Sequence, residues 1–183
     1  MGMPRVSTLP SIFLIMLVPL LIFPGTWRDG EVVSSMDHLS VHSVFQQEPG
    51  GSVQHSALSD PALQFSTFQK RTIEALGSGR SPLWNPDIYA GAPLLGNGQS
   101  RPFSPVTLLH LLLGERWAQN VGVWWLLVWP AVGSFLLMRK LGLRSSASLC
   151  GAMAVPTLPF LQVWLLHPHA STYVWLPWML LCV

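Results

Sequence analysis

Residues 121–138, VGVWWLLVWPAVGSFLLM, contain no charged side chain and decide the fold class. An apolar run of about 18 residues is long enough to cross a hydrocarbon core of about 30 Å as a helix. Trp117 lies just before the run, and tryptophan is common at the membrane–water interface. This stretch therefore predicts a membrane-spanning helix.

Basic residues follow this run at once, at Arg139, Lys140 and Arg144. Short connections rich in Lys and Arg stay in the cytoplasm, whereas long loops cross the membrane largely regardless of their charge. We therefore expect residues 26–116 on the outer side and the N-terminus in the cytoplasm, in agreement with Arg5.

Three further apolar runs predict additional spans. Residues 9–25 are free of charge, and the lack of a small-x-small site after them favours an uncleaved anchor over a signal peptide. Residues 147–166 predict a span that Pro156 and Pro159 kink or break. Residues 172–183 begin another span but reach only about 18 Å. We therefore expect the chain to be a fragment of a longer protein.

The composition agrees with a membrane protein. Only 10% of the 183 residues are Asp, Glu, Lys or Arg, against about 25% in soluble proteins. Seven of the eight acidic residues lie in residues 26–104. The predicted fold is all-α and polytopic, with an anchor at residues 1–25, an extracytoplasmic loop with interfacial helices at residues 26–116, and a truncated transmembrane bundle at residues 117–183.

Charge and cysteine content argue against other classes of protein. The net charge is only +2 and no basic stripe is present, so we expect no nucleic-acid partner. Cys150 and Cys182 lie in apolar runs. They are predicted to be small buried side chains rather than a disulfide or metal ligands.

The outer loop predicts two helices. Asp60 followed by Pro61 is typical of a helix N-cap and first turn, and Gly77 supplies the end. Within residues 59–77, one face carries an apolar stripe, which comprises Phe65, Phe68, Thr72 and Leu76. We expect this amphipathic helix to lie on the membrane surface. Residues 108–113 predict a short interfacial or re-entrant helix with Pro105 near its start, and most of residues 28–57 is expected to be irregular.

Residues 80–105, RSPLWNPDIYAGAPLLGNGQSRPFSP, join these helices. Their many Pro, Gly and Asn residues predict a shaped loop rather than a flexible linker. The ordered set GRSPLWNP at 79–86, GAPL at 91–94, NGQ at 97–99 and FSP at 103–105, with SDP at 59–61 and WLLHP at 164–168, resembles the bacterial YfhO-like membrane proteins of the GT-C glycosyltransferase superfamily. The similarity covers about residues 58–183.

This resemblance implies a multi-pass protein of the bacterial inner membrane that uses a polyprenyl-phosphate-linked sugar as donor and modifies a cell-envelope acceptor. It implies an acidic catalytic residue in the first outer loop, which Asp60 matches. The sugar, the acceptor and any need for a divalent metal stay open, and the sequence indicates no metal site. Because the family's remaining bundle is missing, we expect this chain alone to be inactive.

Each candidate site residue has a competing structural interpretation. Asp60 could take the proton of the acceptor hydroxyl or simply cap a helix, and Asp37 is the alternative acid. Asp87 is expected to fix a turn. The predicted substrate-binding residues are Arg80 and Arg101 for the donor phosphate, His167 and His169 for phosphate or proton transfer, and Trp84, with Tyr89, for stacking on a sugar or prenyl chain. Interfacial anchoring and packing are the alternatives.

Two other functions compete with the enzyme. The chain could belong to a non-catalytic polytopic membrane protein, such as a transport or assembly subunit, or it could be an inactive truncated fragment. A transporter places ionisable groups at mid-membrane, and the predicted spans hold almost none. The sequence therefore favours a site at the outer interface.

Overall fold

The computed structural model describes residues 8–28, 31–41, 53 and 55–183. These residues are mostly helical, which confirms the predicted all-α class. The chain divides into two compact units. Unit 1 comprises Met1–Glu31, Val123–Leu165 and His169–Val183, and unit 2 comprises Val32–Gly122 and Leu166–Pro168.

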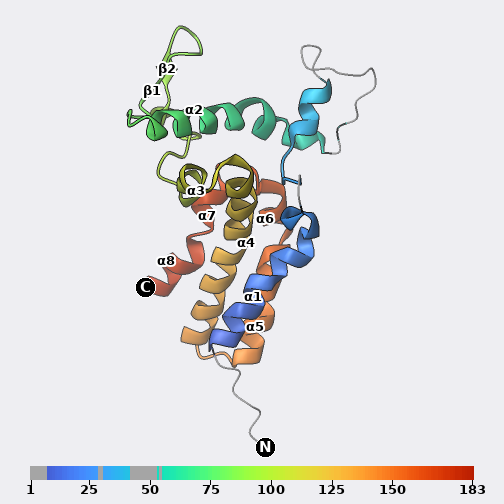
Figure 1. Cartoon of the computed structure of the whole chain (residues 1–183). Coiled ribbons are helices and arrows are strands. Elements are labelled where there is room, and N and C mark those ends of the chain that lie inside the picture. Colours follow the sequence, from blue (N-terminus) through green and yellow to red (C-terminus); the bar gives the residue numbers. More distant parts are fainter. Residues whose placement is uncertain (1–7, 29–30, 42–52, 54) are drawn as a thin grey trace, which may run out of the picture. The chain divides into compact units, whose positions relative to one another are not determined.

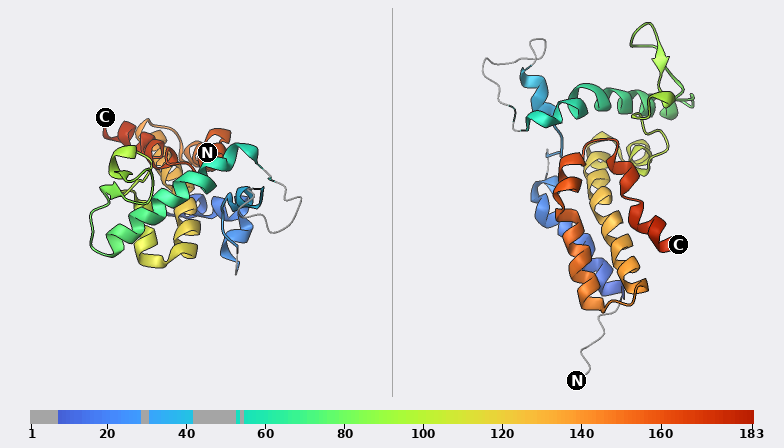
Figure 2. Two further views of the ribbon diagram at one scale, coloured as in Figure 1. Left: turned by 90° about the horizontal axis from the view of Figure 1, so that it is seen from above. Right: turned by 180° about the vertical axis from the view of Figure 1, so that it is seen from behind.

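Unit 1 is built from apolar helices. α1 (Thr8–Ile22) is followed by a 3₁₀ turn, η1 (Pro24–Trp27). The long helix α4 (Glu115–Lys140) enters unit 1 at Val123, and α5 (Ser145–Ala154) follows it. Figures 1 and 2 show α1, α4 and α5 side by side. Their shared core contains one fully buried cluster, formed by Ile15, Ala131, Phe135 and Ala152.

The predicted third span is broken, as its prolines indicate. α5 ends at Ala154, a 3₁₀ turn, η6 (Val155–Thr157), contains Pro156, and a new helix, α6 (Pro159–Trp164), starts at Pro159. Leu158 has extended backbone, with φ −61° and ψ 127°. A residue before proline is driven out of the helical region by the proline ring, and this explains the break.

Two short helices complete unit 1, α7 (Ala170–Tyr173) and α8 (Leu176–Cys182). Tryptophans join α8 to α4. The rings of Trp129 and Trp178 stack with their centroids 4.3 Å apart, and Trp178 Nε1 donates a hydrogen bond of 3.0 Å to the carbonyl of Trp129. Gly133 makes room for this indole, because a Cβ there would lie 2.7 Å from Trp178 Nε1.

Within the described part of the chain, α4 is the one helix that is long and apolar enough to cross a membrane. The helix predicted at residues 121–138 is therefore confirmed in length and composition. The run predicted as the first span forms a helix of only 15 residues, α1, and Ala170–Cys182 is also a shorter apolar helix.

The predicted burial of the two cysteines is wrong. Cys150 and Cys182 are both unpaired and exposed. Cys150 lies in α5 and Cys182 ends α8. An apolar run predicts burial only where every face of the helix is covered, and these helices leave large apolar side chains exposed, such as Met153 and Met179.

Unit 2 is organised around one long helix. The chain is helical from Ser59 to Gly77, first through a wider π-helical segment, η4 (Pro61–Phe65), and then through α2 (Ser66–Gly77). Its buried face repeats at helical spacing and comprises Pro61, Ala62, Phe65, Phe68, Thr72 and Ala75. The predicted amphipathic helix is therefore confirmed, although Ala75 takes the buried place expected for Leu76.

Short 3₁₀ turns precede this helix. They are η2 (Met36–Val41) and η3 (Ser56–Leu58). The described residues between 31 and 58 contain no strand or longer helix, which agrees with the predicted irregular segment, and the rest of residues 28–57 lies outside the described part of the chain.

The shaped loop contains a small antiparallel hairpin that the sequence did not predict. β1 (Trp84–Asn85) pairs with β2 (Ala92–Pro93), with Trp84 opposite Pro93 and Asn85 opposite Ala92. A 3₁₀ turn, η5 (Leu95–Asn97), follows. Figures 1 and 2 show this hairpin near the C-terminal end of α2.

The second predicted outer helix is α3 (Pro105–Leu113), which packs against α2. Ser104 caps it, because the Ser104 hydroxyl accepts a hydrogen bond of 3.3 Å from the amide of Val106. Pro105 occupies the first helical position, and Gly114 ends the helix at φ +74°. Proline at the start and glycine at the end are typical of a helix with these bounds.

Candidate functional site

Asp60 does not cap the helix, so one of its two predicted roles is wrong. Ser59 and Asp60 are already helical, and Asp60 has φ −60° and ψ −42° instead of the extended backbone of an N-cap. Its side chain makes no capping hydrogen bond and is exposed. Within the part of the chain that the structure describes, its carboxylate has no hydrogen-bond or ion-pair partner.

Other polar residues lie at the same end of the long helix. η2, which holds the alternative acid Asp37, packs against η4. His38 is buried, and its Nε2 donates a hydrogen bond of 2.8 Å to the carbonyl of His55. His167 is also buried, with its ring 5.6 Å from that of Phe65 in an edge-on contact. We call the residues of this region, Asp37, His38, Asp60 and His167, the acidic end.

The two predicted histidines fall in different units of the chain. His167 belongs to unit 2, whereas His169 belongs to unit 1, is exposed, and has its ring 5.4 Å from Trp164. Among the residues described, no group of three His, Cys, Asp or Glu side chains could hold a metal ion.

Arg80 and Trp84 lie at the opposite end of the helix. Arg80 is exposed and donates from Nε to the Ser78 hydroxyl at 3.0 Å. Trp84 is 56% exposed. Asp60 precedes Gly77 by 17 residues, which corresponds to roughly 25 Å along a helix. The structure therefore does not bring Asp60 together with Arg80 or Trp84.

Arg101 forms a buried polar network with two residues that the sequence analysis missed, Gln69 and His110. Arg101 Nη2 donates to Gln69 Oε1 at 2.8 Å, and the Gln69 amide nitrogen lies 3.2 Å and 3.4 Å from the two ring nitrogens of His110. His110 Nδ1 donates to the carbonyl of Val106 at 2.8 Å. This leaves Nε2 of His110 as the acceptor for the Gln69 amide. The neutral tautomer of His110 with its proton on Nδ1 can therefore make both hydrogen bonds.

This network, the Gln69 latch (Gln69, Arg101 and His110), joins α2, the loop and α3. Burial lowers the pKa of Arg101 to about 10, so the guanidinium stays charged at neutral pH. Arg101 also adopts a left-handed backbone, with φ 47°, and its carbonyl accepts a hydrogen bond of 2.7 Å from the Thr107 hydroxyl. These contacts favour a structural role for Arg101 over the predicted binding of donor phosphate.

The sequence held a signal for this network. Gln69 lies one position after Phe68 and four after Phe65, at the border of the apolar stripe. His110 lies among leucines in residues 108–113. A polar residue beside each of two apolar stripes predicts a buried hydrogen bond if the two helices pack together.

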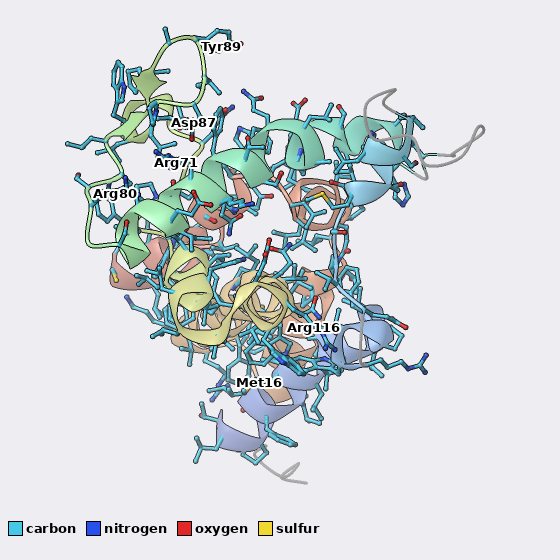
Figure 3. The ribbon with its side chains drawn as sticks, turned by 45° about the horizontal axis from the view of Figure 1, so that its top comes forward. Met16, Arg71, Arg80, Asp87, Tyr89 and Arg116 are labelled. Carbon is cyan, nitrogen blue, oxygen red and sulfur yellow. The ribbon has the colours of Figure 1, made fainter. Side chains whose placement is uncertain are left out.

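Asp87 does not fix its own turn as predicted. The Asn85 side chain does this, because its Oδ1 accepts a hydrogen bond of 3.0 Å from the amide of Asp87. The Asp87 carboxylate instead lies 3.3 Å from Nε of Arg71, which also pairs with Glu74 at 3.5 Å. Figure 3 shows Asp87 and Arg71 between the hairpin and α2, with Tyr89 at the hairpin tip. This ion pair ties the loop to the helix.

Comparison with known protein families, curated proteins and solved structures gave no match to this chain. The family resemblance described above therefore stays a prediction from the sequence.

Proposed function

We propose that the chain is part of a multi-pass membrane glycosyltransferase, in which Asp60 assists the transfer of a sugar from a polyprenyl-phosphate donor to a cell-envelope acceptor. The observation that carries this proposal is the exposed Asp60 carboxylate, which makes no capping bond at the start of a long helix. A carboxylate in this state is available to accept a proton from an acceptor hydroxyl.

The acidic end supplies further groups for such a reaction. Asp37 lies in η2 beside η4, and His167 lies against Phe65, about one and a half turns after Asp60. The proton acceptor and the leaving phosphate both act within a few Å of the same sugar carbon, so their protein partners must lie within roughly 10 Å of each other. His167 lies closer to Asp60 than Arg80 does. The proposed reaction centre therefore includes His167 and excludes Arg80.

The membrane setting of the proposal rests on α4 and the residues after it. α4 has 26 residues, and its last turn carries Arg139 and Lys140. The positive-inside rule then places the connection to α5 in the cytoplasm and residues 26–116 outside the inner membrane, with the N-terminus cytoplasmic. α1 exposes large apolar side chains to its surroundings, including Leu9 and Leu21, and these would face lipid.

One observation favours a non-catalytic membrane subunit as the second candidate. The predicted acid and the predicted cation and aromatic residues lie roughly 25 Å apart along one helix. In a transport or assembly subunit, the loop and its helix would serve as a structural layer with no need for a compact site.

Replacement of Asp60 by Asn in the gene of the source cell tests the proposal. Membranes from these cells would be assayed for transfer of radiolabelled sugar from the lipid donor to the envelope fraction. We expect a loss on the order of 100-fold at normal protein abundance, because Asn cannot accept the proton. Asp37→Asn tests the alternative acid in the same assay. A loss for Asp37→Asn alone moves the role to Asp37, and normal transfer by both proteins favours the non-catalytic subunit.

A further inference from the structure

We infer that the hairpin tip, residues 84–91, is a binding platform for a carbohydrate chain. The biological role of this platform rests on the proposed function, because the bound carbohydrate would be the acceptor of the transferred sugar. The binding itself is independent of catalysis, and the argument for it starts from the way that the tip is built.

The Trp84 ring is held at one edge and is otherwise exposed. A Cβ placed on Gly91 would lie 2.6 Å from both Cζ2 and Nε1 of Trp84 and 2.8 Å from Cε2, the ring atom bonded to both. These distances place Gly91 against the Nε1–Cζ2 edge of the indole, because a position beneath the face would be nearest to Cε2. Trp84 is 56% exposed, so part of its ring surface is available to a ligand.

The backbone that supports this ring is strained at two successive residues, Tyr89 and Ala90, and Gly91 follows them at positive φ. Tyr89, Ala90 and Gly91 have φ values of 50°, 60° and 112°. Tyr89 is 93% exposed, so no packing of its side chain offsets the strain. Hydrogen bonds hold the tip in place, including a bond of 2.7 Å from the Gly91 amide to the Ile88 carbonyl. Strain of this kind is concentrated at sites that bind ligands.

The charged side chains around the tip favour binding of a water-soluble ligand over insertion of the tip into the lipid bilayer. The Asp87 side chain is 63% exposed although it pairs with Arg71. Insertion of the tip into lipid would desolvate this carboxylate at a large cost in free energy. A sugar matches the same groups, since its C–H face can stack on Trp84 while its hydroxyls donate to Asp87.

The position of the tip fits a chain of several sugars. Trp84 and Tyr89 lie on an open surface, as a polymer requires. They are also separated from Asp60 by roughly 25 Å along the helix. An acceptor glycan could therefore rest on the tip while its end lies at Asp60.

A binding measurement with the full chain in lipid nanodiscs tests the platform. The probes are fluorescently labelled hexamers of β-linked glucose and of β-linked N-acetylglucosamine, followed by anisotropy. We expect saturable binding of at least one hexamer, weakened about tenfold by Trp84→Ala, because one stacking contact is removed. Trp84→Phe keeps a ring and should recover part of the affinity.

Two controls keep the test specific. Trp117, which is 43% exposed elsewhere in unit 2, should tolerate replacement by Ala without loss of binding. Binding is measured without a sugar donor, so a failure of the proposed enzyme is distinguished from a failure of the platform. The inference is overturned if neither hexamer binds, if Trp84→Ala binds normally, or if Trp84→Ala weakens only the binding of phosphatidylglycerol vesicles.

Discussion

Two parts of the long helix in unit 2 treat their polar side chains differently. In the Gln69 latch, near the middle of the helix, the Gln69 side chain meets partners from two other segments, and the Arg101 to Gln69 bond is 2.8 Å long. At the acidic end, the Asp60 carboxylate is exposed and makes no capping bond. The latch therefore accounts for the shape of the loop, while Asp60 is left available for chemistry.

The two parts are expected to differ in what they contribute to stability. Buried hydrogen-bonded groups are costly to remove, because their partners lose both water and protein contacts. An exposed carboxylate with no described partner contributes little to stability. Residues in the two parts should thus respond differently to substitution.

The largest effect is expected for Gln69→Leu. This change leaves the buried Arg101 guanidinium and His110 without their shared partner, which should lower the free energy of unfolding by about 3 kcal/mol. Gln64 is exposed on the same helix, and Gln64→Leu is the matched control with an expected change below about 0.5 kcal/mol. Chemical unfolding in detergent checks both values. Equal effects of the two substitutions would argue against the latch.

Gly91→Ala should have the next largest effect. Its φ of +112° is unfavourable for alanine, and the new Cβ would lie 2.6 Å from the Trp84 ring. We expect a loss of about 2 kcal/mol that is confined to the hairpin and measurable by hydrogen exchange. Gly77→Ala is the control, since a Cβ there meets only Leu111 Cδ2 at 3.8 Å. A hairpin that exchanges no faster than in the wild type would contradict this geometry.

Arg101→Lys should make the stability of unit 2 depend on pH. The burial that lowers the pKa of Arg101 to about 10 should also hold the pKa of a lysine below its ordinary value of about 10.4. As the pH rises toward that value, the native state loses its proton before the unfolded state does. The unfolded state binds more protons in this window, so the free energy of unfolding rises with pH.

The wild-type protein should show no such rise from Arg101 below pH 10, and Arg80→Lys, at an exposed position, is the second reference. Unfolding midpoints measured from pH 7 to pH 9.5 distinguish these cases. A flat profile for Arg101→Lys would mean that the site at Arg101 is open to water.

The smallest effect is expected for Asp60→Ala. Because Asp60 makes no capping bond, its removal should change the free energy of unfolding by less than about 0.5 kcal/mol. Ser104 is a true cap, and Ser104→Ala should cost about 1 kcal/mol. Thermal unfolding of the two variants checks this order. A loss for Asp60→Ala as large as that for Ser104→Ala would restore the capping role.

Much of the fold could be predicted from the sequence, because helical spacing and proline positions act locally. The stripe of Phe65, Phe68 and Thr72 marked the buried face of α2, and Pro156 and Pro159 marked the break after α5. The sequence misled where a local pattern had two outcomes. Asp60 before Pro61 is typical of a cap, but the chain is already helical at Ser59, so the cap geometry is lost.

The site was less predictable, since its contacts join residues far apart in the chain. The bond between Arg101 and Gln69 spans 32 positions, and the contact between Phe65 and His167 spans about a hundred. Composition places Arg101 in a loop without showing that the loop folds back on α2. The same reason explains why the sequence predicts Asp60 and Arg80 in one site, although the helix separates them.

The most direct test of this account measures sugar transfer and unfolding together for Asp60→Asn and Gln69→Leu. We predict that Asp60→Asn lowers transfer on the order of 100-fold and leaves the unfolding midpoint unchanged. Gln69→Leu should lower the midpoint and keep transfer per folded molecule near the wild-type value. Normal transfer by the Asp60→Asn protein, or a fall in its stability as large as that of Gln69→Leu, would contradict the division of this helix into a structural middle, at Gln69, and a chemical end, at Asp60.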